Sequence, residues 1–364
     1  MSVERGHTDE SRTATATVPG RVNLIGEHLD YNGGMVLPCA LSQVLTIRLT
    51  PHEGSQVIVE SDHTDEVAYR TIEEAPANHW SDHSVGAIRA ARELGLLNSG
   101  AKLSIASTVP QGAGLSSSAA LIVGVLKASR RLAGNTVLSD VEVAKAARIV
   151  ENDYIGVPCG IMDQMAVAIA KPGQAIALDT VTLDYDVVEL FPKHSFVVVH
   201  SGVSRKLTDG RYKTRKLECD EAARELGTDK LCQTPLEIIQ ETSGLAEHLR
   251  RRARHCRTEH TRVIDAVSAL QHHMPDDFGS LMTASHRSMR DDFEMSTPEI
   301  DRLVDDAVAI GALGARLTGG GFGGCIVALV EEARKKDWLE RLLQAHPAAR
   351  WVSDVRQTPA SDPS

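Results

Sequence analysis

The chain has 364 residues, more than one ordinary hydrophobic core holds, so we expect one large domain or two fused domains. Its 42% hydrophobic and 24% charged residues are typical of a globular protein in water. Lys and Arg number 39 against 49 Asp and Glu, a net charge of −10, and no basic stripe suggests a nucleic-acid partner. We interpret one cluster of basic residues as a charged helix face: Arg250, Arg251, Arg252 and Arg254.

The six cysteines are scattered, with no CxxC pair and no spacing typical of metal ligands. We therefore expect reduced, mostly buried thiols in a reducing compartment. The first dozen residues are polar and lack the apolar core of a signal peptide. No run approaches the roughly 18 apolar residues of a membrane span. These features predict a cytoplasmic protein without a membrane partner.

The first half of the chain alternates predicted strands and helices. Residues 13–18 alternate Thr with Ala and Val, as in a strand, and Pro19-Gly20 is expected to end it. Further strands are expected over 36–50, 57–61, 103–109 and 175–178, and helices over 78–94, 115–132 and 141–154. An acidic, alternating stretch covers 181–191.

A polar loop, RVNLIGEHLDYNGG at residues 21–34, follows the first strand. It carries a guanidinium, carboxylates and an imidazole between apolar neighbours and closes on Gly33-Gly34. A solvated loop would explain this composition. A site for a ligand with many hydroxyls explains it better, because binding residues gather on loops at strand ends.

A serine-rich loop, PQGAGLSSS at residues 110–118, leads into an apolar helix. Gly112 and Gly114 allow the backbone to approach a ligand, and unpaired N–H groups gather where the helix begins. This arrangement suits a phosphate, although a simple helix N-cap with small residues explains the loop equally well. The loop has no lysine, so any cation must come from elsewhere.

The segment CGIMDQ, residues 159–164, precedes another predicted helix. Gly160 lies before the helix start and Asp163 in its first turn. An acid at this position is most often stabilised by the helix dipole alone.

After a boundary near residues 183–195, the chain becomes mostly helical. A strand over 196–200 precedes expected helices over 210–226, 246–271, 275–293 and 298–311. Strands over 314–318, 325–330 and 350–353 and a helix over 331–344 complete it. The glycine-rich loop, residues 319–324, formally matches G-x-G-x-x-G, but a strand and not a helix follows, which excludes a dinucleotide site. We interpret it as a turn whose backbone approaches another ligand-bearing element.

Four stretches together resemble the GHMP family of small-molecule kinases. PQGAGLSSSAAL is similar to its phosphate-binding motif and LTGGGFGGC to its C-terminal glycine motif. PGRVNLIGEHLDYNGG closely resembles the galactokinase signature within that family, and CGIMDQ strengthens the match. The resemblance runs from about residue 18 to residue 330, with the motifs in the family's order.

The resemblance implies an α+β, two-domain architecture. Residues 13–190 would form a mixed-sheet N-terminal domain with the polar and serine-rich loops, and 191–356 a ferredoxin-like C-terminal domain with the glycine-rich loop; residues 1–12 and 357–364 are expected to be disordered tails. It also implies ATP-dependent phosphorylation of α-D-galactose at its anomeric hydroxyl, with Mg²⁺ as cofactor. We expect a monomer whose partners are the sugar and MgATP.

The resemblance also assigns roles to individual residues. It implies that Asp163 is the catalytic aspartate, with Arg21 as its partner. The sugar-contacting positions would be Glu27, His28, Asp30, Gly160 and Tyr212. The nucleotide would contact Gly112, Gly114, Ser116, Ser117, Ser118 and Trp80, and Mg²⁺ would bind Ser118 and Glu151. Leu29 and His83 stand where many family members have threonine and tyrosine.

Two alternatives remain open. A related kinase could phosphorylate N-acetylgalactosamine, L-arabinose or galacturonate at C1. A non-catalytic galactose sensor could share the fold, although the retained serines 116–118 and Asp163 argue against it.

Overall fold

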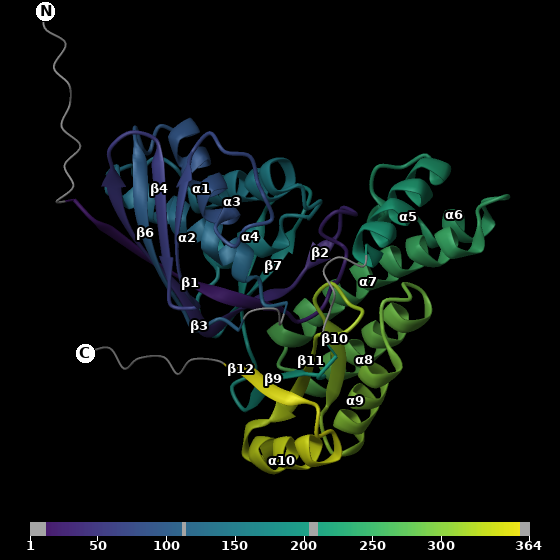
Figure 1. The fold of residues 1–364 in the computed structure, drawn as a ribbon. Coiled ribbons are helices and arrows are strands. Elements are labelled where there is room, and N and C mark those ends of the chain that lie inside the picture. Colours follow the sequence, from purple (N-terminus) through teal and green to yellow (C-terminus); the bar gives the residue numbers. More distant parts are fainter. Residues whose placement is uncertain (1–11, 111–113, 204–209, 357–364) are drawn as a thin grey trace, which may run out of the picture. The chain divides into compact units, whose positions relative to one another are not determined.

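A computed structural model describes residues 12–110, 114–203 and 210–356, and their contacts divide the chain into two compact units (Figure 1). Unit 1 comprises residues 1–20, 43–109 and 116–169, and unit 2 comprises 21–42, 110–115 and 170–364. The units interleave in sequence, so they do not test a single linear boundary at residue 190. The expected tails lie outside the described residues, apart from Arg12.

The sheet of unit 1 is mixed. The strands of this sheet that lie wholly or partly in unit 1 are β1 (Ala14–Asn23), β3 (Pro38–His52), β4 (Gln56–Ser61), β5 (Thr64–Thr71) and β6 (Gly100–Ser107). β3 pairs antiparallel with β6, β6 pairs parallel with β4, and β4 and β5 form an antiparallel pair. The expected end of β1 at Pro19-Gly20 is wrong, because the strand continues to Asn23. Among the strands of the described residues β1 pairs with β3 alone, and an edge strand tolerates a proline that donates no hydrogen bond.

Helices cover this sheet in unit 1, where Figure 1 shows them gathered along one face. They are α1 (Asp82–Glu93), α2 (Ser117–Leu132), α3 (Asp140–Ile149) and α4 (Met162–Ile169), with a π-helical turn, Val150–Ile155, continuing α3. Most residues of α2 are buried. The helix packs so closely on the sheet that a Cβ at Gly124 would lie 2.9 Å from the Ile47 side chain of β3. α1 starts later than residue 78 because Asp82 accepts the backbone N–H groups of Ala77 and His79.

The second sheet, in unit 2, is antiparallel in the order β10-β11-β9-β12. Its strands are β9 (His194–His200), β10 (Gly314–Thr318), β11 (Cys325–Glu331) and β12 (Arg350–Val355). Helices separate β9 from β10, and α10 (Lys335–Ala345) separates β11 from β12. This βαββαβ order confirms the ferredoxin-like topology expected for the C-terminal part.

Unit 2 also contains a 3₁₀ turn at Leu231–Gln233 and five further helices: α5 (Arg211–Leu226), α6 (Leu236–Glu241), α7 (Glu247–Gln271), α8 (Pro275–Asp291) and α9 (Pro298–Ala309). In Figure 1, α8 and α9 lie beside β10. A Cβ at Gly314 would lie 1.9 Å from the carbonyl oxygen of Gly279, so α8 and β10 meet backbone to backbone. Strands β2 (Met35–Val36), β7 (Gln174–Asp179) and β8 (Tyr185–Glu189) pair antiparallel in the same unit.

The expected charged face at residues 250–254 is wrong. Arg252 on α7 is 1% exposed, and its guanidinium lies 2.6 Å from both Glu218 and Glu294. Successive residues of an α-helix point in different directions, at about 3.6 residues per turn, so one of the four arginines turns inward. The cysteines agree with expectation, because all are free thiols and only Cys159 is partly exposed. None of the helices within the described ranges has the length and apolar character needed to cross a membrane.

Candidate active site

The start of α2 has backbone N–H groups that no intrahelical carbonyl can accept from. Gly114 and Ser116 have φ of 74° and 60°, and this left-handed turn directs the chain into the helix; Gly112 lies outside the described residues. Ser116 would ordinarily cap the helix, but its hydroxyl donates to Asp163 instead. The first amides of a helix have no intrahelical acceptor. In the part of the chain that the structure describes, no side chain caps α2, so its N-terminus suits an anion.

Asp163 lies in the first turn of α4 and is half-buried. Ser116 therefore ties its carboxylate to the start of α2 within unit 1. Gly160 is buried two residues before α4 begins. Arg21 belongs to unit 2, so its partnership with Asp163 stays a prediction.

Glu151 lies in the π-helical turn, a distortion often found at functional sites. Its carboxylate is buried and accepts hydrogen bonds from Ser118, at 2.8 Å, and from Gln164. A carboxylate and a hydroxyl are hard oxygen ligands of the kind that Mg²⁺ takes. No group of three or more His, Cys, Asp and Glu within the described residues could hold a metal ion. Mg²⁺ would therefore need water or phosphate ligands as well, which it usually keeps.

Trp80 precedes α1 and is held by an exposed carboxylate on β5. Its indole N–H donates to Oε2 of Glu66 at 3.0 Å, and the other oxygen of Glu66 lies 3.1 Å from Nε2 of His79. Arg70 adds a 2.9 Å ion pair to Asp82, which fixes the start of α1. His83 is half-buried, and burial lowers its pKa.

In unit 2, Arg21 lies against the first part of the serine-rich loop. Its guanidinium donates to the carbonyl oxygen of Gly114 at 2.7 Å, and its backbone N–H donates to Leu115 at 3.2 Å. Arg21 is 6% exposed. The loop that lacks a lysine thus has a buried cation beside Gly114.

Aromatic rings gather around His28 on the polar loop. His28 has a φ of 62° and is 4% exposed, and its Nδ1 lies 2.5 Å from the Tyr31 hydroxyl. Its ring centroid is 5.1 Å from Tyr212, the second residue of α5, and 4.7 Å from Phe293. Asp30, on the same loop, is half-buried. The structure therefore brings His28 and Tyr212 together, although they are far apart in sequence.

Glu27 joins the polar loop to the glycine-rich loop. Its Oε1 accepts hydrogen bonds from the backbone N–H of Gly319 at 2.8 Å and from the hydroxyl of Thr318 at 3.1 Å. Arg316 lies 3.6 Å from the same oxygen. The close backbone approach expected of the glycine-rich loop is present, and its partner is Glu27.

Sequence reasoning missed the residues beneath the polar loop. Glu259 on α7 accepts the Gly26 N–H at 3.0 Å and Arg262 Nε at 2.7 Å. Burial acts to raise its pKa, but the charges of Arg262, His255 and Arg316 lower it to about 2. His255 lies 3.2 Å from the carbonyl oxygen of Glu27, and burial lowers its pKa to about 4. No sequence signal identifies these two residues. On a helix as rich in charge as α7, the sequence of a buried acid looks the same as that of a solvent-exposed one.

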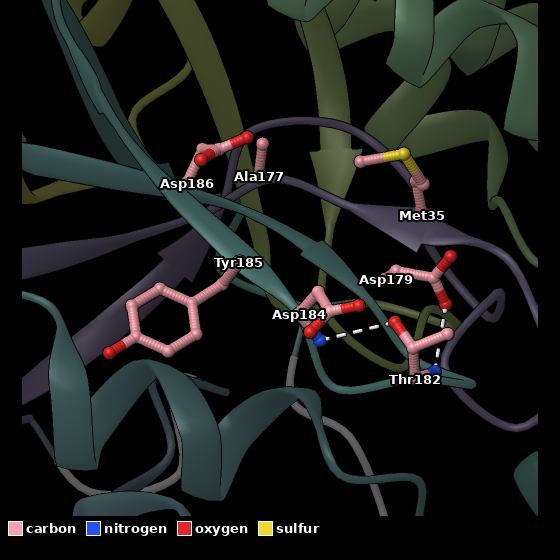
Figure 2. A pocket seen from close by; sticks show the side chains of 7 residues that line it. All are labelled: Met35, Ala177, Asp179, Thr182, Asp184, Tyr185 and Asp186. Atoms are coloured by element: carbon pink, nitrogen blue, oxygen red, sulfur yellow. Dashed lines mark hydrogen bonds between the residues drawn. The ribbon is translucent and has the colours of Figure 1, made fainter.

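A separate cavity of about 300 Å³ in unit 2 contains none of the predicted site residues (Figure 2). Its lining comprises Met35, Ala177, Asp179, Thr182, Asp184, Tyr185 and Asp186. The Asp179 carboxylate accepts the N–H groups of Val181 and Thr182, and so serves the turn between β7 and β8. This acidic cavity is therefore distinct from the candidate site.

Family models match three parts of the chain. The galactokinase galactose-binding signature matches residues 5–51, which include the polar loop. The GHMP kinases N terminal domain matches 82–171, and the GHMP kinases C terminal domain matches 266–348.

Full-length relatives extend these matches. A galactokinase of Actinobacillus pleuropneumoniae is 38% identical over 93% of this chain and 90% of its own length. A galactokinase of Mycobacterium bovis is 38% identical over 92% of this chain and 93% of its own length. The crystal structure of Lactococcus lactis galactokinase complexed with galactose has a TM-score of 0.90 at 31% identity and covers 98% of this chain and 96% of that one. Methanococcus jannaschii mevalonate kinase shares the fold. Its crystal structure has a TM-score of 0.70 at 22% identity and covers 94% of this chain and 98% of that one.

Proposed function

Because the chain belongs to the galactokinase family of GHMP kinases, we propose that it transfers the γ-phosphoryl group of ATP to the anomeric hydroxyl of α-D-galactose. The products are galactose 1-phosphate and ADP. One observation carries the proposal: Ser116 binds Asp163 at the uncapped start of α2. This contact joins a carboxylate for the sugar hydroxyl to an anion site for the phosphates.

Phosphoryl transfer passes through a loose transition state, so the protein mainly positions the groups and stabilises charge. The amides at Ser117 and Ser118 bind the phosphates, and Arg21 supplies a cation beside Gly114. Ser118 and Glu151 would hold Mg²⁺, which neutralises phosphate charge when bound. Trp80, oriented by Glu66, lies beside the nucleotide base.

Asp163 acts on the attacking hydroxyl in one of two ways. It accepts the proton late, as charge develops on the oxygen, or it orients the hydroxyl by accepting its hydrogen bond. The Ser116 hydroxyl stabilises the negative carboxylate in both cases. Arg21 is its proposed partner from unit 2.

Polar groups recognise the sugar by pairing with its hydroxyls. An epimer of galactose leaves one or more of these groups without a partner. Glu27, His28, Asp30 and Tyr212 supply acceptors and donors from unit 2, and Gly160 adds a backbone contact. An unsatisfied buried polar group costs about 1–3 kcal/mol, enough for roughly fivefold to 150-fold discrimination. His28 is already oriented by Tyr31 and lies against the tilted ring of Tyr212, which reduces the ordering cost of binding.

A sugar panel tests the proposal. Purified protein is incubated with MgATP and galactose, N-acetylgalactosamine, L-arabinose, galacturonate or glucose, and ADP release is followed. We expect galactose to give the highest kcat/KM, and phosphorus NMR to identify the 1-phosphate. A higher kcat/KM for another sugar would reassign the substrate. Galactose binding without ADP release would indicate a sensor, and light scattering checks the expected monomer.

A further inference from the structure

The two oxygens of the Glu27 carboxylate have different surroundings. Oε1 contacts three donors from one stretch of chain, Arg316, Thr318 and Gly319, at 2.8–3.6 Å. Oε2 makes no hydrogen bond to the residues described in the structure, although the side chain is only 3% exposed. The carboxylate is thus bound through one oxygen.

The same stretch also holds the backbone of the polar loop. The Thr318 hydroxyl lies 2.9 Å from the carbonyl oxygen of Asn23, and Arg316 donates to that oxygen at 3.3 Å. Thr318 is 2% exposed, and its single hydroxyl proton serves Asn23 or Glu27 at one time. The end of β10 therefore contacts the polar loop at two positions.

The backbone of Glu27 is fixed from the opposite side by α7. His255 lies 3.2 Å from its carbonyl oxygen, and Glu259 accepts the N–H of the preceding residue, Gly26. Gly26 has a φ of 102°, and a Cβ there would lie 2.9 Å from Val263. With the backbone held by α7 and Oε1 held by β10, the direction of Oε2 is determined.

The glycine-rich loop is itself held in place. The N–H of Phe322 donates to the carbonyl oxygen of Met295 at 2.7 Å, and the guanidinium of Arg211 lies 4.4 Å from the centre of the Phe322 ring. Arg211 immediately precedes Tyr212, whose ring packs on His28. The glycine-rich loop thus connects with the polar loop through Glu27 and through Arg211–Tyr212.

We propose that Thr318 and Gly319 are positioning residues for the sugar: they bind Oε1 of Glu27 so that Oε2 faces a sugar hydroxyl. The inference rests on the proposed function. It makes the glycine-rich loop part of sugar recognition. Loss of the contact between Glu27 and these two residues weakens sugar binding and epimer discrimination, and leaves nucleotide binding unaffected.

Thr318→Val tests the proposal, because valine keeps the shape and removes the hydroxyl. We expect the KM for galactose to rise roughly threefold to tenfold, as for one lost hydrogen bond, with kcat and the KM for ATP within about twofold. The ratio of kcat/KM for galactose over glucose should fall. Thr318→Ser restores the hydroxyl and should recover near wild-type values. Thr283→Val is the matched control, since within the described ranges the Thr283 hydroxyl donates to Gly279 of its own helix and to no other residue.

Several outcomes would overturn the inference. An unchanged KM for galactose in T318V, or equal increases in both KM values, would assign Thr318 a purely structural role. Amide hydrogen exchange checks the contact without turnover: Glu27→Ala should speed exchange at Gly319 by at least about tenfold, and an unchanged rate would refute the contact. Wild-type protein that neither binds nor phosphorylates galactose would refute the proposed function and this inference together. Galactose turnover with an unchanged T318V refutes this inference alone.

Discussion

Ser118 donates a 2.8 Å hydrogen bond to Oε1 of Glu151. The contact joins the first turn of α2 to the π-helical turn that follows α3. Gln164 on α4 binds the other oxygen of Glu151, so the carboxylate is held from two sides. An oxygen pair that is fixed before a cation arrives needs little rearrangement to bind it.

Glu151→Gln should weaken the binding of Mg²⁺ at the site, because the amide removes the charge and keeps the size. We expect the half-saturating Mg²⁺ concentration to rise roughly tenfold to a hundredfold. Initial rates over a Mg²⁺ titration at constant ATP measure this. Asp153→Asn changes an exposed acid of the same turn and serves as the control. Equal Mg²⁺ dependence in the two variants would remove Glu151 from the metal site.

Asp163→Asn should separate chemistry from binding. The amide cannot accept the proton or stabilise the developing charge, so kcat is expected to fall roughly 10²- to 10⁴-fold. Galactose affinity by calorimetry should remain largely unchanged. Near wild-type kcat would exclude Asp163 from the reaction, and parallel loss of affinity would make it mainly a sugar ligand.

Asp30→Ala should act on the sugar alone. A sugar hydroxyl that loses its half-buried acceptor costs about 1–3 kcal/mol, so the KM for galactose should rise roughly fivefold to 150-fold. Steady-state kinetics with each substrate varied in turn make the comparison. An increase confined to the KM for ATP would show that the polar loop does not bind the sugar.

Acid should destabilise the protein through His255. Burial lowers its pKa to about 4 from an ordinary value of 6.5, so the unfolded chain binds the proton more tightly. The contribution of neutral His255 to the free energy of unfolding is fully present above pH 6.5. It is lost as the pH falls toward 4, and the loss is about 3 kcal/mol. Burial also lowers the pKa of His286, which adds to the slope.

Urea unfolding between pH 7 and pH 4 measures the effect. His255→Gln should flatten the dependence in part, since His286 still contributes. His248→Gln, an exposed histidine on the same helix, should leave the slope unchanged. Equal slopes in wild type and H255Q would show that His255 is not buried in its neutral form.

Glu259→Gln should destabilise the fold strongly. The amide takes the carboxylate partner from Arg262 and leaves buried Arg316 with Glu27 alone, and breaking a buried ion pair costs about 3–5 kcal/mol. The folded-state pKa of Glu259 is about 2, below its usual 4.5, so the difference should persist above pH 4.5 and shrink as the pH falls through about 2. Glu247→Gln on the exposed side of α7 should cost little. Equal unfolding free energies would mean that the charge of Glu259 contributes nothing.

The sequence by itself determined the serine-rich loop, the position of Asp163 in the first turn of a helix and the succession of strands and helices along the C-terminal part of the chain. These depend on local backbone preferences: glycines permit the turn before α2, and apolar periodicity distinguishes strands from helices. Its motifs also predicted family and reaction, because they combine residues that lie within a few positions of one another.

Only the tertiary structure decided what surrounds the polar loop. Gly26 and Glu259 are 233 positions apart, and Glu27 and Gly319 are 292 apart. Local pattern cannot distinguish a buried Glu259 or Arg252 from a solvated one on a helix rich in charge. Their burial is favourable only because opposite charges from other elements meet them there, and that meeting is a property of the folded chain.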